Sequence, residues 1–253
     1  DLSSLTINRS ACPTRPIIIK AKNQGQVILN GATALVLDGL QYVTLQGFSF
    51  RSANVGTGIK MLNCNRVRIT RNSFKLDETN INSCNWLYIG DTFGSTAPLR
   101  SGNNRIDYNS FEGKTKSGKF ILLDGNINQQ TQRDTIAYNI FKNNGPREEN
   151  EKETIRIGVS TLSQSNGYTV VEYNLFEDCD GDPEIVSVKS FANTVRYNTF
   201  RRCLGTVCLR QGNNSVVEGN YFFGEGKTAI YTNENGNSSI IGAGGVRVYG
   251  KNH

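Results

Sequence analysis

Histidine is almost absent from this sequence, and its absence excludes several catalytic classes. The one histidine among the 253 residues is His253, at the last position. A Ser-His-Asp triad, a Cys-His pair or a histidine-rich zinc site would therefore have to be built on a chain end. We set these mechanisms aside.

Long hydrophobic runs are also missing. The longest, such as Ile17–Ile19 and Phe120–Leu123, are far too short to span a bilayer, so we expect no membrane partner. Hydrophobic residues make up 37% and charged residues 20% of the sequence, which excludes a disordered acidic chain. No secretory signal is found, and we expect a mature or trimmed chain with a sizeable core.

The sequence is basic but lacks the patterns of nucleic-acid-binding proteins. Its net charge is +6 at pH 7, and its pI is near 9.0. Such a field favours a polyanionic partner: nucleic acid, an anionic membrane or an acidic polysaccharide. No basic run is interleaved with aromatic residues, and no helix-turn-helix, zinc-finger or RRM signature occurs. We therefore expect no nucleic-acid partner.

Cysteine pairs with CxxC spacing are absent as well. The six cysteines lie at positions 12, 64, 84, 179, 203 and 208, which argues against zinc ribbons and thioredoxin-like redox sites. Disulfides in an exported protein and buried free thiols both stay open. Three N-glycosylation sequons, at Asn8, Asn213 and Asn237, are compatible with secretion.

What the sequence contains is a repeat. Each of eight segments has two or three β-favouring residues, then Gly, Asn or Asp, one further residue, and Phe. These segments are residues 43–50, 67–74, 87–93, 106–111, 136–141, 170–176, 195–200 and 216–222. Their last residues are separated by 18 to 35 positions. A base period near twenty with enlarged members is typical of a solenoid that carries loop insertions.

The alternation of apolar and polar residues in each segment predicts strands. A strand unit of about twenty residues cannot bury its inner face alone, but units stacked in parallel form a continuous core. We therefore predict one all-β domain over residues 1–253, a parallel β-helix with coils of about 20–25 residues and loop insertions. The recurring Phe should stack inside, and the recurring Asn should serve a turn through left-handed geometry or side-chain hydrogen bonding.

Two further expectations follow from this repeat. The sequence starts near a strand, at Leu5–Ile7, and stops after Gly245–Gly250, which resembles the start of another coil. Solenoids need polar caps, so we expect one or both caps to be missing or supplied elsewhere. Cys179 and Cys203 are 24 residues apart on adjacent coils, and we expect a disulfide between them.

The enlarged units predict where a binding groove is built, since loops on one face of a solenoid commonly form it. The insertions fall in residues 112–133 and 142–167 and are rich in charge. Lys114 and Arg156 from these insertions are our candidates for substrate binding; a solvated loop is the alternative.

The densest polar signal outside the repeat is a Lys/Arg pair. Lys189 and Arg210 are 21 residues apart, close to one coil, which places them on neighbouring coils about 4.8 Å apart. Val188 and Leu209 should point inward, so the two cations point outward. Two stacked cations repel unless an anionic ligand binds between them; an unrelated surface pair is the alternative.

The residues around this pair resemble a known family. The segments are Glu153–Gly158, Tyr168–Glu177, Glu184–Ser190, Tyr197–Arg201, Gly205–Gly212, Val217–Gly224 and Gly244–Gly250. They are similar to polysaccharide lyase family 6, which contains alginate lyases and chondroitinase B. The resemblance covers the chain from about Pro16 onward. It implies a right-handed parallel β-helix and a secreted enzyme that cleaves uronic-acid polysaccharides by β-elimination.

The resemblance also implies roles for individual residues. Lys189 matches the family's Brønsted base and Arg210 its catalytic arginine. In many members a calcium ion neutralises the substrate carboxylate, and Asp182 and Glu184 match its acidic ligands, with Asn150 the candidate for an asparagine ligand. Strict alternation would put Glu184 on the opposite face from Lys189, so a bend at Pro183 is needed.

One position departs from the family pattern. Where the family has Arg-His-Gly, this sequence has Gln211 between Arg210 and Gly212. Glutamine can hydrogen-bond to a substrate but cannot titrate, which leaves the Lys/Arg mechanism intact and puts the substrate preference in doubt. Arg247, in the family's Gly-Val-Arg-Val motif, is a candidate for binding a substrate carboxylate.

The sequence leaves three hypotheses for the function. The first is a lyase acting on alginate, with dermatan or chondroitin sulfate as the competing substrate. The second is a β-helical glycoside hydrolase, which would need clustered carboxylates; Asp180, Asp182 and Glu184 are the candidates for them, but the hydrolase motifs are missing. The third is a non-catalytic β-solenoid in which Lys189 and Arg210 only hold a polyanion.

Overall fold

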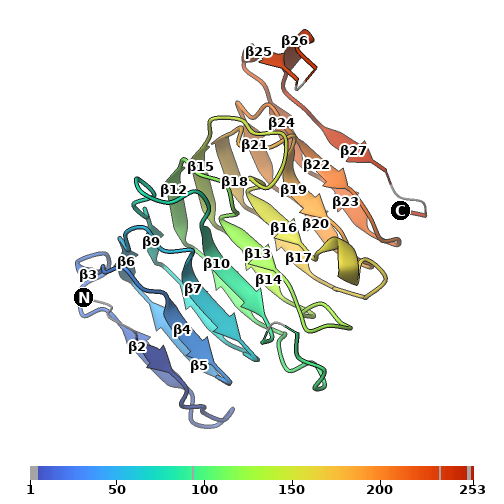
Figure 1. Ribbon diagram of the computed structural model, residues 1–253. Coiled ribbons are helices and arrows are strands. Elements are labelled where there is room, and N and C mark those ends of the chain that lie inside the picture. The colour runs from blue at the N-terminus through green and yellow to red at the C-terminus, as the bar shows by residue number, and fades with distance from the viewer. Residues whose placement is uncertain (1–4, 93, 234, 250–251) are drawn as a thin grey trace.

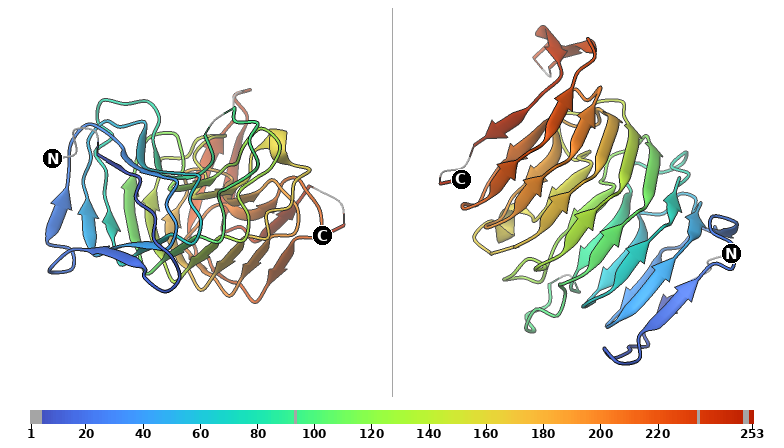
Figure 2. Two further views of the ribbon diagram at one scale, coloured as in Figure 1. Left: turned by 90° about the horizontal axis from the view of Figure 1, so that it is seen from below. Right: turned by 180° about the vertical axis from the view of Figure 1, so that it is seen from behind.

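The computed structural model describes residues 5–92, 94–233, 235–249 and 252–253. Strands repeat in threes along the described chain, and each member of a triplet joins a different parallel sheet. The resulting coils stack in chain order from the N-terminal to the C-terminal end (Figures 1 and 2). The described residues contain one short 3-10 helix, η1 (Ser160–Leu162), and no helix long and apolar enough to cross a membrane.

Three parallel sheets run the length of the stack. The first sheet comprises β1 (Thr6–Ile7), β4 (Leu35–Asp38), β7 (Thr57–Leu62), β10 (Asn85–Gly90), β13 (Ile121–Leu123), β16 (Ile155–Ile157), β19 (Glu184–Val188), β22 (Thr206–Leu209) and β27 (Val246–Val248). The second comprises β2 (Ile17–Lys20), β5 (Val43–Gln46), β8 (Arg68–Thr70), β11 (Arg105–Asp107), β14 (Thr135–Ala137), β17 (Val170–Glu172), β20 (Thr194–Arg196) and β23 (Val216–Glu218). The third comprises β3 (Val27–Leu29), β6 (Phe48–Phe50), β9 (Ser73–Phe74), β12 (Ser110–Lys114), β15 (Ile140–Asn144), β18 (Leu175–Cys179), β21 (Thr199–Arg201) and β24 (Tyr221–Phe223).

Within a sheet, neighbouring strands are one coil apart in the sequence. This is a right-handed parallel β-helix, and the predicted fold class is confirmed. An antiparallel hairpin, β25 (Thr228–Thr232) and β26 (Ser238–Gly242), interrupts the last coil and projects from the stack (Figure 1).

A column of stacked phenylalanines fills the core, as the repeat predicts. Ring centroids of successive members lie 4.4–5.1 Å apart, with interplanar angles of 6–19°. Equivalent residues of parallel strands stand about one strand spacing apart, so the rings stack face to face. The members are Phe50, Phe74, Phe111, Phe141, Phe176, Phe200 and Phe222.

One predicted member of the repeat belongs elsewhere. Residues 87–90 of the segment 87–93 belong to β10 in the first sheet, whereas the ladder phenylalanines end segments of the third sheet; Phe93 lies outside the described residues. Alternation ending in Phe marks a strand with an inward face, but it does not tell which of the three sheets the strand joins. Successive ladder positions are therefore 22 to 37 residues apart, so several coils are longer than predicted.

The recurring asparagines form a second ladder at the turn between the second and third sheets. In Asn109, both the backbone N–H and the side-chain Nδ2 donate to Oδ1 of Asn139, each over 3.0 Å. The predicted role in side-chain hydrogen bonding is thus confirmed. The left-handed backbone falls one residue earlier, for example at Tyr108 (φ 55°) and Tyr138 (φ 57°).

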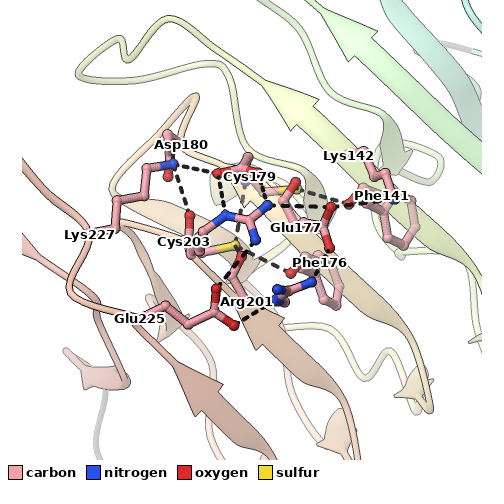
Figure 3. A network of polar contacts seen from close by, with 12 residues as sticks. Phe141, Lys142, Phe176, Glu177, Cys179, Asp180, Arg201, Cys203, Glu225 and Lys227 are labelled. Carbon is pink, nitrogen blue, oxygen red and sulfur yellow. Dashed lines mark hydrogen bonds and ion pairs between the residues drawn. The ribbon is translucent and has the colours of Figure 1, made fainter.

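The predicted Cys179–Cys203 disulfide is wrong: both thiols are free in this structure. The two residues do stack on adjacent coils, and the Cys179 N–H donates to the Cys203 sulfur over 3.4 Å. Each thiol instead turns to a carbonyl of the coil before it, that of Phe141 or Phe176 (Figure 3). Arginine and lysine side chains on the adjoining surface form ion pairs with Glu177, Asp180 and Glu225 (Figure 3).

Candidate active site

Lys189 and Arg210 occupy equivalent positions on neighbouring coils. Val188 pairs with Leu209 in the first sheet, and both side chains are buried. Alternation then turns the next residue of each coil outward. The Arg210 N–H donates to the Val188 carbonyl over 2.8 Å, which continues the ladder past the strand ends.

Both side chains line one pocket of about 460 Å³. Segments distant in sequence meet there, among them the insertion around residue 150, the neighbouring coils that carry β19 and β22, and the region of β27. The pocket collects seven of the nine residues that the sequence singled out: Asn150, Asp182, Glu184, Lys189, Arg210, Gln211 and Arg247. Lys189 has only 11% of its side chain exposed, whereas Arg210 has 45%, so the amine lies deeper than the guanidinium.

A β-bulge brings Glu184 to the face of Lys189. Glu184 pairs with Thr206 and Val186 with Val207, so Ile185 is an extra residue in β19. Ile185 and Val186 are both buried, and the alternation of the strand is shifted by one residue between Glu184 and Lys189. The bend that the sequence required is therefore present, within β19 rather than at Pro183.

Acidic groups crowd the floor of the pocket. Burial, together with the nearby carboxylates of Glu153 and Glu184, raises the pKa of Asp182 to about 7. Asp182 accepts hydrogen bonds from the backbone N–H groups of Glu184 (2.8 Å) and Lys152 (3.3 Å), and no cation of the described chain lies within 4.0 Å of it. A crowded carboxylate that has no cation beside it suits a hard cation such as calcium.

A calcium ion would have to use few protein ligands. Among the residues that the structure describes, no group of three Asp, Glu, His or Cys side chains is arranged to hold a metal. Asp182 and Glu184 line the same pocket as Asn150 and provide carboxylate and amide oxygens, with water completing the shell. The oxygen-only donor set therefore fits calcium.

Glu153 is a neighbour of the site to which the sequence assigned no role. Its side chain is 1% exposed, and its carboxylate lies 3.6 Å from the Lys189 Nζ, 3.6 Å from an Arg156 nitrogen and 3.5 Å from the Lys119 Nζ. It stands just before β16, on the coil preceding Lys189. Strict alternation would place Glu153 on the same inward face as Ile155, so no local pattern could have found its contact with Lys189.

Two predicted substrate-binding residues lie outside the pocket lining. Lys114 is fully buried, and its Nζ donates to Glu78 (2.7 Å) and to the Cys84 carbonyl (2.6 Å), so the prediction that it binds substrate is wrong. Lys114 is the last residue of β12, and its side chain packs inside the coil. The charge of a predicted loop could not reveal that inward direction. Arg156 is 12% exposed, and its guanidinium pairs with the Glu151 carboxylate over 2.9 Å, so an acidic side chain of the pocket lining already holds it.

A family model supplies the decisive comparison. The model of chondroitinase B matches residues 3–253, almost the entire chain. The chain belongs to this family. The resemblance to polysaccharide lyase family 6 is thereby confirmed, and these enzymes share its fold. No curated protein matches.

Solved structures agree with the family. A mannuronic acid specific polysaccharide family 6 lyase from human gut microbiota is 28% identical, with a TM-score of 0.75 over 87% of this chain and 51% of its own. The family 6 alginate lyase AlyGC is also 28% identical, with a TM-score of 0.73 over 88% of this chain and 30% of its own. The family 6 lyase Pedsa3628 from Pseudopedobacter saltans is 26% identical, with a TM-score of 0.73 over 97% and 53%. This chain spans about half of these relatives or less.

Gln211, the departure from the family pattern, lies in the pocket wall beside Arg210. Its side-chain Oε1 is buried and has no hydrogen-bond partner among the described residues. A buried carbonyl oxygen of this kind can accept a hydrogen bond from a ligand hydroxyl.

Proposed function

We propose that this chain is the catalytic β-helix of a lyase that cleaves a uronic-acid polysaccharide, with alginate as the first candidate, by β-elimination. The observation that carries the proposal is the meeting of Lys189 and Arg210 with Asp182, Glu184 and Asn150 around one pocket. A base, a charge stabiliser and hard oxygen ligands are the groups that elimination next to a carboxylate requires.

Lys189 is the proposed Brønsted base. Its neutral Nζ takes the proton from C5 of the uronate, and the electron pair of that bond moves toward the carboxylate. The C4–C5 double bond then forms as the bond from C4 to the glycosidic oxygen breaks.

Arg210 is the proposed charge stabiliser. Its guanidinium is exposed at the pocket mouth and carries donors that match a carboxylate. Negative charge on the substrate carboxylate grows as the C5 proton leaves, so this contact strengthens in the transition state. The leaving glycosidic oxygen takes its proton from Arg210 or from water.

A calcium ion held by Asp182, Glu184 and Asn150 would neutralise the substrate carboxylate and make the C5 proton more acidic. The support for this ligand set is the crowding of Asp182, which has no cation beside it among the described residues, against Glu153 and Glu184, together with the oxygen-only chemistry of the donors.

Alginate is the preferred substrate for two reasons. The basic net charge of +6 suits a polyanion, and the two relatives that are 28% identical are a mannuronic acid specific lyase and an alginate lyase. Gln211 and Arg247 are proposed to contact the substrate directly. Arg156 is proposed to influence it through the carboxylates of Glu151 and Glu153, with which it pairs. Because the polymer is too large to enter a cell, the enzyme is proposed to be secreted.

The test follows the unsaturated product. The protein is incubated with alginate, dermatan sulfate and polygalacturonate, with and without EDTA, and the ultraviolet absorbance of the new conjugated double bond is recorded. Lys189→Ala should abolish the signal, whereas Lys142→Ala, a surface lysine on β15 outside the pocket, should leave it unchanged.

Each outcome is informative. A rise on one polymer that is lost in Lys189→Ala establishes the elimination and names the substrate, and EDTA sensitivity assigns the cation. A folded protein that produces no rise on any polymer refutes the lyase activity of this chain and favours a solenoid that only binds polyanions.

A further inference from the structure

Tyr249 extends the Lys189–Arg210 column by one coil. Val188 pairs with Leu209 and Leu209 with Val248, so the residues that follow these three positions stand in line along the outer face. The Tyr249 N–H donates to the Leu209 carbonyl over 3.0 Å, and the side chain lines the same pocket. The sequence analysis assigned this tyrosine no role.

Two guanidinium groups lie against the Tyr249 ring. The Arg210 Cζ lies 4.6 Å and the Arg247 Cζ 4.3 Å from the ring centroid. Both distances are short for cation–π contacts, which extend to about 6 Å. They are also shorter than those of the six other such contacts in the described residues, which range from 5.1 to 5.8 Å.

The two arginines have little other anchoring. Arg247 has no carboxylate within 4.0 Å in the described part of the chain. Arg210 has Glu184, but the Nε to Oε1 distance of 3.6 Å is longer than a hydrogen bond. Two like charges at one pocket mouth would repel and spread into solvent unless a third group held them.

An aromatic face holds a cation in a way that a carboxylate does not. It attracts the flat guanidinium through its quadrupole while using none of the in-plane N–H donors. A carboxylate would take up these donors as a bidentate partner and cancel the positive charge. A ring in this place leaves the N–H donors of both arginines open to an anionic ligand.

We propose that Tyr249 is a positioning residue whose ring fixes Arg210 and Arg247 so that their free N–H donors together bind the carboxylates of a uronate polymer. The inference rests on the proposed function and deepens it, since it makes the ring and two arginines one recognition unit. The ring is the active feature; the hydroxyl is not required.

The substitution can be made without unfolding the protein, because Tyr249 is 47% exposed and lies outside the hydrophobic core. Tyr249→Phe keeps the ring, and Tyr249→Leu removes it. Tyr221→Leu is the matched control, because Tyr221 is 61% exposed, lies on β24 outside the pocket and contacts neither arginine.

The kinetic experiment measures kcat and KM on the polymer that the wild type cleaves. Tyr249→Leu should lower kcat/KM about ten-fold, the effect of losing cation–π contacts of this kind, with kcat falling more than KM rises because charge grows in the transition state. Tyr249→Phe should stay within about two-fold of the wild type. Adding Tyr249→Leu to Arg210→Lys should cost less than adding it to the wild type, since a lysine ammonium presents no flat face to the ring and only the Arg247 contact is then left to lose.

A binding measurement separates this inference from the proposed function. Titration calorimetry with a saturated alginate oligosaccharide is done in the Lys189→Ala background, where no chemistry occurs. Weaker binding in Tyr249→Leu than in Tyr249→Phe supports the positioning role even if the wild type makes no unsaturated product.

Three results would overturn the inference. Tyr249→Leu could match the wild type in both kinetics and binding. Tyr249→Phe could be as impaired as Tyr249→Leu, which would transfer the role to the hydroxyl. Equal loss in Tyr221→Leu would show a general effect on the fold.

Discussion

Replacement of Asp134 by asparagine should stabilise this protein at neutral pH. Asp134 is fully buried just before β14, and burial raises the pKa of its carboxyl from 3.8 to about 6. It accepts hydrogen bonds from the Asn104 N–H (2.9 Å) and the Thr131 hydroxyl (2.6 Å), but no cation pairs with it among the described residues. The equivalent position on a neighbouring coil is Asn104 itself, whose amide oxygen accepts the Val67 N–H.

The magnitude follows from linkage. Each pKa unit is worth about 1.4 kcal/mol, so a rise from 3.8 to about 6 corresponds to a cost of about 3 kcal/mol for the ionised form. The folded pKa lies above the unfolded one. The cost is therefore absent below pH 3.8, grows as the pH rises toward about 6, and stays constant above it. Asparagine keeps an oxygen for the Asn104 N–H and carries no charge.

The assay is urea unfolding of the wild type and Asp134→Asn at a series of pH values from 4 to 8. The variant should be about as stable as the wild type near pH 4 and more stable by up to about 3 kcal/mol above pH 6. Asp107→Asn is the control of opposite sign. The Arg68 and Arg105 guanidinium groups, which bond the Asp107 carboxylate, hold its pKa below the usual value against the effect of burial. A difference between wild type and Asp134→Asn that does not change with pH would refute the reasoning.

Two further predictions concern buried groups. Lys114→Met should lower the free energy of unfolding by about 3–5 kcal/mol in urea titrations, because it leaves the Glu78 carboxylate buried without its cation, and adding Glu78→Gln should recover most of the loss; equal instability of the double variant would contradict this. A thiol count in denaturant without reductant should find all six cysteines, whereas the native protein should react first at Cys12, the one cysteine that is not buried; a count of four would restore a disulfide.

The fold was predictable because the residues that stack between coils recur in the sequence with the period of the coil. Phe and Asn recur at each coil because each faces its own copy one strand spacing away. The pattern could not say which sheet a strand joins, so the segment 87–93 was placed in the wrong ladder. The alternation of inward and outward residues is the same in all three sheets, and only the pairing of strands tells them apart.

The pair of Lys189 and Arg210 was predictable for the same reason. A separation close to one coil puts two outward residues side by side, and sequence distance alone gives that result. Lys114 was chosen for the charge of its insertion alone, and its side chain instead runs inward to Glu78, a contact between residues 36 positions apart. The bulge at Ile185 and the contact of Tyr249 with Arg210 depend on backbone register and side-chain direction, which no local pattern specifies.

The amino-acid sequence by itself determined a parallel β-helix of stacked coils, its family, and a lysine and an arginine on neighbouring coils. The coils and the lysine–arginine pair follow from the period of the coil, and the family follows from the resemblance of the motifs around that pair, so a one-dimensional pattern contains all three. The tertiary structure decided which carboxylates crowd beside that lysine, which charged loop residues are buried, and that one tyrosine ring lies against two arginines. Such contacts depend on where loops of unequal length return to the stack and on the direction each side chain then takes.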